Sequence, residues 1–87
     1  MEYHLDFTQK AVEDIAIHKK AGNKAILKKM FILLAELKTH PFAGTGKPEP
    51  LKHKLSGMWS RRVNKHHRLV YEVHENTVFI LSAKGHY

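Results

Sequence analysis

The sequence predicts an α+β fold in which two N-terminal helices pack on an antiparallel, twisted sheet, in the order β-α-α-β-β-β(-β). Three patterns predict it: an alternating segment at the start, two successive helical stretches, and several short strand-like segments joined by turns. The chain has 87 residues. We expect residues 1–87 to form a single domain, because a chain this short supports one small hydrophobic core.

The first strand and the first helix are predicted by periodicity and by a capping residue. Apolar and polar side chains alternate from Tyr3 to Phe7, as in a strand with one buried face. Thr8 can then cap a helix that continues to about Ala21. The residues expected on the inner stripe of this helix are Val12, Ile15 and Ala16.

A second, more strongly amphipathic helix follows. Gly22 suits the left-handed end of the first helix, and Asn23 can cap the second. Pro41 ends the second helix, because a residue before proline is pushed out of helical geometry. The apolar stripe is about as wide as a core-facing helix needs, so we expect it to pack against the sheet rather than on a membrane. The stripe comprises Ile26, Leu27, Met30, Phe31, Leu33, Leu34 and Leu37.

The rest of the chain is predicted to be a loop followed by an antiparallel meander. The loop from Pro41 to Pro50 is rich in glycine and proline, which suit ordered turns. The connections between the later strands are too short for parallel crossovers. Strands are expected at residues 58–63, 67–73 and 77–83, with a weaker one at 52–55.

The composition favours an acidic partner. Fifteen Lys and Arg against eight Asp and Glu give a formal net charge of +7, and such a field attracts phosphate backbones. The absence of cysteine excludes disulfides and thiolate metal sites. No apolar run approaches the roughly 18 residues of a membrane span, and no secretory signal is recognised, so a soluble, cytoplasmic protein is expected.

A group of cations is predicted to bind phosphate. Arg61, Arg62 and Arg68 fall on adjoining predicted strands, which lie about 4.8 Å apart in a sheet, and Lys52 and His53 are near in sequence. Crowded cations are unfavourable unless an anion relieves them, and the guanidinium fork can grip a phosphate at two points. A solvated basic edge that deters aggregation would explain the same pattern.

Three further residues could carry chemistry, but their spacing leaves the alternatives open. Glu49 lies between two prolines and is either a placed carboxylate or a loop charge paired with a lysine. His86 can exchange a proton near neutral pH, although chain ends usually fray. Tyr87 is as well explained as a packing side chain.

Other side chains give weaker signals. The eight histidines show no metal spacing supported by a carboxylate or a cysteine, so neither a metal nor another cofactor is expected. Trp59 could stack on an RNA base, but we favour a place in the core or at an interface.

Taken together, several segments resemble the YoeB/Txe toxins of the RelE superfamily, the toxic halves of bacterial toxin–antitoxin pairs. They read KPEPLKH at 47–53, LSGMWSRR at 55–62, HRLVY at 67–71 and His86-Tyr87 at the end. The resemblance covers essentially the whole chain, and the segments are specific only jointly. One departure is Lys84-Gly85, where family members commonly have an arginine and an aromatic residue.

The resemblance implies a microbial-ribonuclease-like fold and ribosome-dependent cleavage of messenger RNA in the ribosomal A site. The RNA's own 2′-hydroxyl would attack the adjacent phosphate, without a metal. On this basis Glu49 is the general base, Arg68 stabilises the phosphate, His86 is the general acid and Tyr87 helps to align the site. Lys52 and Arg62 match cations that hold the substrate.

The resemblance also implies partners: the ribosome with its mRNA, and a YefM/Axe-like antitoxin whose acidic, flexible C-terminal segment covers the basic face. A homodimer is expected from the family, although the sequence does not demand one. Two rival functions remain. One is a non-catalytic RNA- or ribosome-binding module regulated by an antitoxin, and the other is an interaction protein whose only ligand is the antitoxin.

Overall fold

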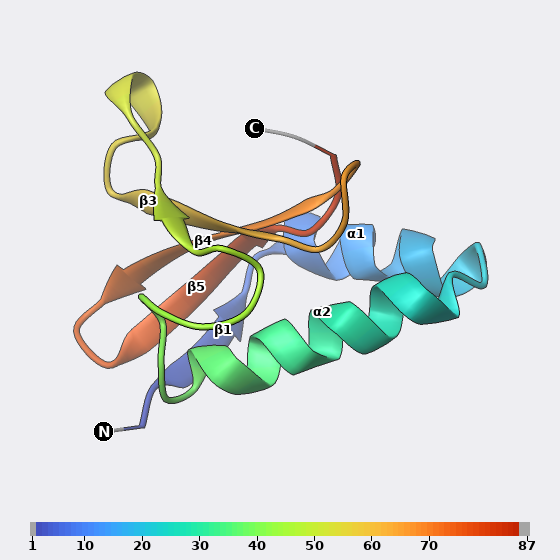
Figure 1. Cartoon of the computed structure of the whole chain (residues 1–87), viewed down its shortest axis with the longest axis horizontal. Helices are drawn as coiled ribbons and strands as arrows, with labels where there is room; N and C mark the ends of the chain where they lie inside the picture. Colours follow the sequence, from blue (N-terminus) through green and yellow to red (C-terminus); the bar gives the residue numbers. More distant parts are fainter. Residues whose placement is uncertain (1, 86–87) are drawn as a thin grey trace.

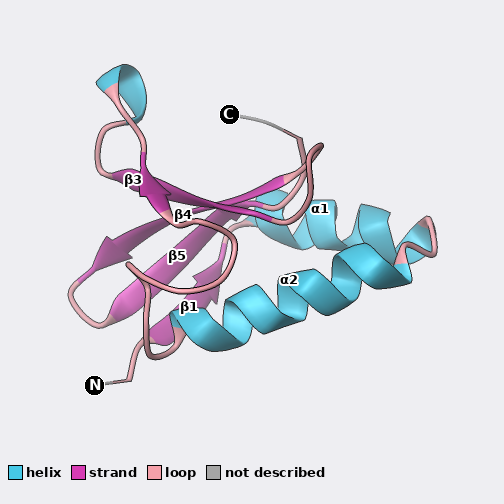
Figure 2. Cartoon of the chain, viewed as in Figure 1, coloured by secondary structure: helices cyan, strands magenta, loops and turns pink. Residues whose placement is uncertain are grey.

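The computed structural model describes residues 2–85 and shows a five-stranded sheet with both helices on one face (Figure 1 and Figure 2). The elements in chain order are β1 (His4–Phe7), α1 (Gln9–Lys20), α2 (Lys24–Leu37), β2 (Glu49–Pro50), a 3-10 turn (His53–Leu55), β3 (Met58–Arg62), β4 (Arg68–His74) and β5 (Thr77–Ser82). The predicted α+β class and order of elements are confirmed.

The strand order in the sheet is β1-β5-β4-β3-β2. The strands from β2 to β5 are antiparallel neighbours, whereas β1 runs parallel to β5. The predicted strand at 52–55 is wrong, because His53 has a left-handed backbone (φ 59°) and begins a 3-10 turn. Glu49–Pro50 forms the edge strand instead, where a proline is tolerated because no further strand needs its missing N–H.

The core lies between α2 and the central strands. The buried face of α2 is narrower than predicted, since Phe31 is 52% exposed. The main core side chains are Met30, Leu33, Leu34 and Leu37 from α2, and Leu69, Tyr71, Val78 and Ile80 from the sheet. Within the described residues, no helix has the length and apolar character needed to cross a membrane.

Helix α1 presents only part of the predicted face: Ile15 packs against the core, as expected, but the other two residues of the predicted stripe do not. The Thr8 hydroxyl caps it, as expected, but Val12 is 50% exposed and Ala16 is also exposed. The prediction followed only apolar side chains, whereas two of the inward-facing residues are polar. The buried residues of α1 are Ala11, Asp14 and His18.

Asp14 and His18 are buried because both bind the backbone at the end of β5. The Asp14 carboxylate accepts a hydrogen bond from the N–H of Ala83 at 2.9 Å, and the His18 Nε2 atom lies 3.0 Å from the Ala83 carbonyl oxygen. Helix α1 therefore fixes the point at which β5 ends, and with it the start of the segment that leads to Gly85.

Candidate active site

One small cavity collects charged residues from the loop after α2 and from strands β2, β3 and β4. Its volume is about 50 Å³, and it is lined by Gly46, Lys47, Glu49, Ser60, Arg62 and Arg68. Three of these, Glu49, Arg62 and Arg68, are predicted site residues. A carboxylate and two guanidinium groups meet there, which is a combination suited to acid–base chemistry on a phosphate.

The register of the sheet places these side chains on the face away from the helices. Glu49 pairs with Ser60, and Arg62 pairs with Arg68. Paired residues on neighbouring strands point to the same face, as do residues two apart along one strand. Arg61 lies between Ser60 and Arg62 and points to the opposite face, where it contacts α2. The four cavity residues on the strands therefore share one face.

Gly46 brings the loop after α2 against β3. Its carbonyl oxygen accepts a hydrogen bond from the N–H of Arg62 at 2.7 Å. Gly46 has a φ of 84°, and a Cβ atom there would lie 2.9 Å from the Arg62 carbonyl oxygen. Any other residue at this position would have a strained backbone, and its Cβ atom would clash with Arg62. Glycine therefore allows the loop to approach β3 closely and to form one side of the cavity.

Arg68 is held through both its backbone and its side chain. Its N–H donates to the Gly85 carbonyl at 3.0 Å, and its Nη1 donates to the Asn64 carbonyl at 3.2 Å. The N–H of Gly85 donates in turn to Nδ1 of His67 at 2.9 Å, and the His67 ring packs edge-on against His18 with the ring centroids 4.8 Å apart. These contacts keep Gly85 beside Arg68.

His86 and Tyr87 lie outside the described residues, so their predicted roles as acid and as aligning aromatic stay predictions. Gly85, which immediately precedes His86 in the chain, is the residue bonded to Arg68.

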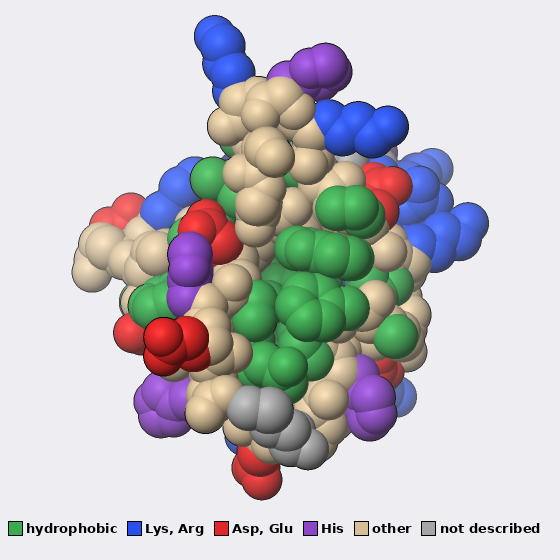
Figure 3. All heavy atoms as spheres, turned by 90° about the vertical axis from the view of Figure 1, so that its left-hand side faces the viewer, with side chains coloured by type: hydrophobic (Ala, Val, Ile, Leu, Met, Phe, Trp, Pro, Cys, Tyr) green, Lys and Arg blue, Asp and Glu red, His purple; other side chains and the backbone are tan. Residues whose placement is uncertain are grey.

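Lys52 and His53 lie on the other side of Glu49 from the cavity. Both side chains are exposed and lie on or next to the 3-10 turn. This turn projects from the top of the molecule in Figure 1, and Figure 3 shows basic side chains around it. Lys52 and His53 line a groove of about 320 Å³ together with Glu49. Glu49 therefore borders both the cavity and the groove, and the substrate-binding roles of the other two stay predictions.

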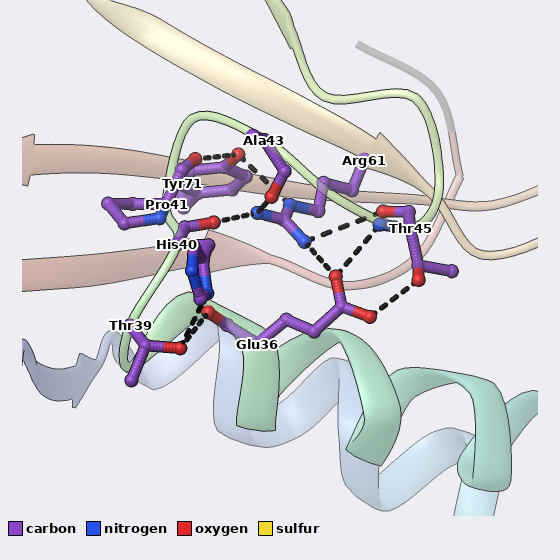
Figure 4. Close-up of polar contacts among 8 residues, drawn as sticks. All are labelled: Glu36, Thr39, His40, Pro41, Ala43, Thr45, Arg61 and Tyr71. Atoms are coloured by element: carbon purple, nitrogen blue, oxygen red, sulfur yellow. Dashed lines mark hydrogen bonds and ion pairs between the residues drawn. The ribbon is translucent and has the colours of Figure 1, made fainter.

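The structure contradicts the predicted phosphate-binding role of Arg61. Its side chain is fully buried, and its guanidinium donates to the Glu36 carboxylate at 3.0 Å (Figure 4). The same guanidinium also donates to three backbone carbonyls of the loop after α2, those of His40, Ala43 and Thr45. A group buried among these acceptors does not face RNA, so we leave Arg61 out of the candidate site.

Tyr71 and Thr45 complete this network. Nε of Arg61 donates to the Tyr71 hydroxyl at 3.3 Å, and that hydroxyl donates to the Pro41 carbonyl at 2.6 Å. Burial raises the pKa of Tyr71, against the effect of Arg61. Hydrogen bonds from the Thr45 hydroxyl and N–H, with a smaller effect of Arg61, lower the pKa of Glu36 despite its partial burial. The network anchors the loop that leads into the cavity.

Sequence reasoning gave Ser60 no role although it lies within the LSGMWSRR segment, because only the sheet register places it opposite Glu49. The larger hollows along α2, of about 520 and 550 Å³, are lined by none of the predicted site residues. In the described part of the chain, no three His, Asp or Glu residues are grouped so that they could hold a metal ion.

The sequence matches a family model described as "YoeB-like toxin of bacterial type II toxin-antitoxin system" over residues 7–87. The chain belongs to the YoeB-like toxin family. The toxin YoeB of Escherichia coli K12 is 49% identical over 74 residues, which are 85% of this chain and 88% of that protein.

Solved structures of YoeB toxins share the whole fold. A YoeB/ParE toxin from Agrobacterium tumefaciens matches with a TM-score of 0.91 at 34% identity, over 97% of this chain and 99% of that one. YoeB from Staphylococcus aureus, solved as a dimer and in complex with YefM, matches over the full length of both chains with TM-scores of 0.85 and 0.84 at 39% and 40% identity. The predicted family and fold are confirmed.

Proposed function

We propose that this YoeB-like toxin is a ribosome-dependent endoribonuclease that cleaves messenger RNA in the ribosomal A site and so inhibits translation. The observation that carries the proposal is the shared cavity of Glu49, Arg62 and Arg68. A carboxylate and two guanidinium groups lie there on one face of the sheet, which suits transfer at a phosphodiester.

In the proposed reaction Glu49 accepts the proton of the RNA 2′-hydroxyl, and the resulting oxygen attacks the adjacent phosphorus. The bond from phosphorus to the 5′-oxygen breaks, and His86 donates a proton to that departing oxygen. The products are a 2′,3′-cyclic phosphate and a 5′-hydroxyl, so the reaction balances without a metal or another cofactor. Positioned acids and bases of this kind typically contribute about 10²–10⁴-fold in rate.

Arg62 and Arg68 supply the positive charge for the phosphate as negative charge builds up on its oxygens. They form a cross-strand pair, and a guanidinium binds phosphate oxygens with two parallel donors. Arg68 is oriented in advance by its bond to the Asn64 carbonyl, which lowers the cost of ordering it in the transition state. We assign Lys52 and His53, beside the groove, to the flanking phosphates, and Tyr87 to alignment of the site.

The proposed protein partner is an antitoxin. Staphylococcus aureus YoeB has been solved in complex with YefM, and the present chain carries a net charge of +7. We propose a YefM/Axe-like antitoxin whose acidic, flexible C-terminal segment orders on the basic face and covers the cavity. A homodimer is proposed in the same way, from the Staphylococcus aureus YoeB dimer.

Ribosomes stalled on a defined message test the proposal, with new 5′ ends mapped by primer extension. Wild-type protein should cut within the A-site codon. Glu49→Gln should lose at least about 10²-fold in rate while binding ribosomes within a few-fold of wild type. Glu75→Gln, an exposed carboxylate in the turn between β4 and β5, is the control and should cut normally. Tight ribosome binding by the wild type without any cut would instead support the non-catalytic binding module.

A further inference from the structure

We infer that Ser60 is a further substrate-contacting residue, whose hydroxyl donates a hydrogen bond to a non-bridging oxygen of the scissile phosphate. The inference rests on the proposed function, because it assigns a ligand atom within the same cavity. Ser60 lies within the LSGMWSRR segment that carries the family resemblance, but the resemblance assigns no role to this serine.

The first observation is the burial of an unpaired hydroxyl. Ser60 is 1% exposed, and within the described part of the chain its Oγ atom has no hydrogen-bond partner. Buried polar atoms in folded proteins are nearly always paired, because losing water without gaining a partner is costly. The Ser60 hydroxyl, which has no partner within the described chain, is therefore free to donate a hydrogen bond to a molecule in the cavity.

The second observation is where this hydroxyl lies. Ser60 lines the cavity formed with Glu49, Arg62 and Arg68. It is the direct cross-strand partner of Glu49 and lies two positions before Arg62 on β3. The register therefore puts the serine between the proposed base and the proposed phosphate-binding cations, on the same face of the sheet.

The chemistry of the lining identifies the ligand atom. Besides Glu49, the charged side chains of the lining are those of Lys47, Arg62 and Arg68, which are cationic and can only donate hydrogen bonds. A negatively charged acceptor such as a phosphate oxygen therefore suits the cavity. A hydroxyl can add one more donor to such a group. With a volume of about 50 Å³, the cavity is much smaller than the neighbouring groove of about 320 Å³, so it suits a small charged group such as phosphate oxygens.

This assignment separates catalysis from folding. Because Ser60 Oγ forms no hydrogen bond within the described chain, Ser60→Ala removes no bond that stabilises the fold. Its melting temperature should equal or exceed that of the wild type, since an unsatisfied hydroxyl is lost. Its cleavage rate should fall, because a donor to a charged oxygen is lost in the transition state.

The test is single-turnover cleavage on programmed ribosomes, with melting temperatures measured alongside. Ser60→Ala should cleave about 10- to 100-fold more slowly than wild type, and Ser60→Thr, which keeps the hydroxyl, should recover most of the rate. Ser82→Ala is the matched control, because both serines are cross-strand partners of Val70 on β4. Ser60 pairs with Val70 from β3, and Ser82 pairs with it from β5. This control should cleave like wild type.

A message with one non-bridging oxygen of the scissile phosphate replaced by sulfur identifies the contacted atom. Wild type should be slowed by sulfur in one of the two stereochemical positions, and Ser60→Ala should lose that sensitivity. Wild-type-like cleavage by Ser60→Ala, or an unchanged response to sulfur, would overturn the inference and leave the proposed function standing. If wild type does not cleave the unmodified message, both are overturned.

Discussion

The guanidinium of Arg61 lies 3.0 Å from the carboxylate of Glu36, with the Arg61 side chain completely buried. The pair joins β3 to α2 on the helix-covered face of the sheet. The neighbouring Arg62 points to the other face and lines the cavity. The two adjacent arginines therefore have different roles. Arg61 anchors the loop after α2, and Arg62 faces the proposed substrate.

The first prediction concerns this division. Arg61→Met removes the partner of Glu36 and leaves the carbonyls of His40, Ala43 and Thr45 without their donor. We expect a loss of about 3 kcal/mol in the free energy of unfolding, measured by urea denaturation. Arg62→Met is the matched change on the exposed side and should alter stability by less than about 0.5 kcal/mol. Equal losses in the two variants would contradict the assignment.

The second prediction is a pH dependence of stability. The pKa of Glu36 is lowered, first by the Thr45 hydroxyl and also by Arg61. A carboxylate of this kind contributes its full stability above its ordinary pKa, near 4.3, and loses it as the pH falls through the lowered value in the folded state. The gap in unfolding free energy between wild type and Glu36→Gln should therefore be widest near pH 7 and shrink steadily below about pH 4.

Thr45→Ala should reproduce part of that gap, because the hydroxyl is the largest cause of the lowered pKa. A gap between wild type and Glu36→Gln that is the same at pH 7 and pH 3 would show that the charge of Glu36 contributes nothing to folding.

The third prediction concerns the end of β5. Asp14→Ala removes the acceptor of the Ala83 N–H, so exchange of that amide with deuterated solvent should speed up by about tenfold or more. Glu13→Ala, an exposed neighbour on α1, should leave the exchange unchanged. Unchanged protection of Ala83 in the Asp14 variant would mean that α1 does not hold the strand end.

Much of the fold could be predicted because the spacing of apolar residues along the chain follows the buried face of each helix or strand. The alternation before Thr8, most of the apolar stripe of α2 and the short meander connections reflect contact with a core on one side. Periodicity failed where a polar side chain is buried for its hydrogen bonds. Asp14 carries no apolar signal although it is buried. The apolar pattern of α1 therefore predicts Ile15 correctly but also includes Val12 and Ala16, which are exposed.

The candidate site was predictable in part for a related reason. The family resemblance implies roles for Glu49 and Arg68, whereas spacing alone leaves the role of Glu49 open, and both residues line the cavity. The sequence could not tell which of Arg61 and Arg62 faces outward, because adjacent strand residues exchange faces with a one-residue shift of register. The position of Ser60 opposite Glu49 also depends on the strand register. The sequence could not predict that register, because β2 pairs with β3 through only two residues.

The most direct test of the central claim uses a message with a single 2′-deoxynucleotide immediately 5′ of the scissile phosphate. We predict that wild-type protein binds the stalled ribosome but makes no cut at that position, while the all-ribose message yields a 2′,3′-cyclic phosphate and a 5′-hydroxyl. Cleavage of the deoxy message, or a 5′-phosphate end on the product, would contradict attack by the RNA's own 2′-hydroxyl and with it the role of Glu49 as the base.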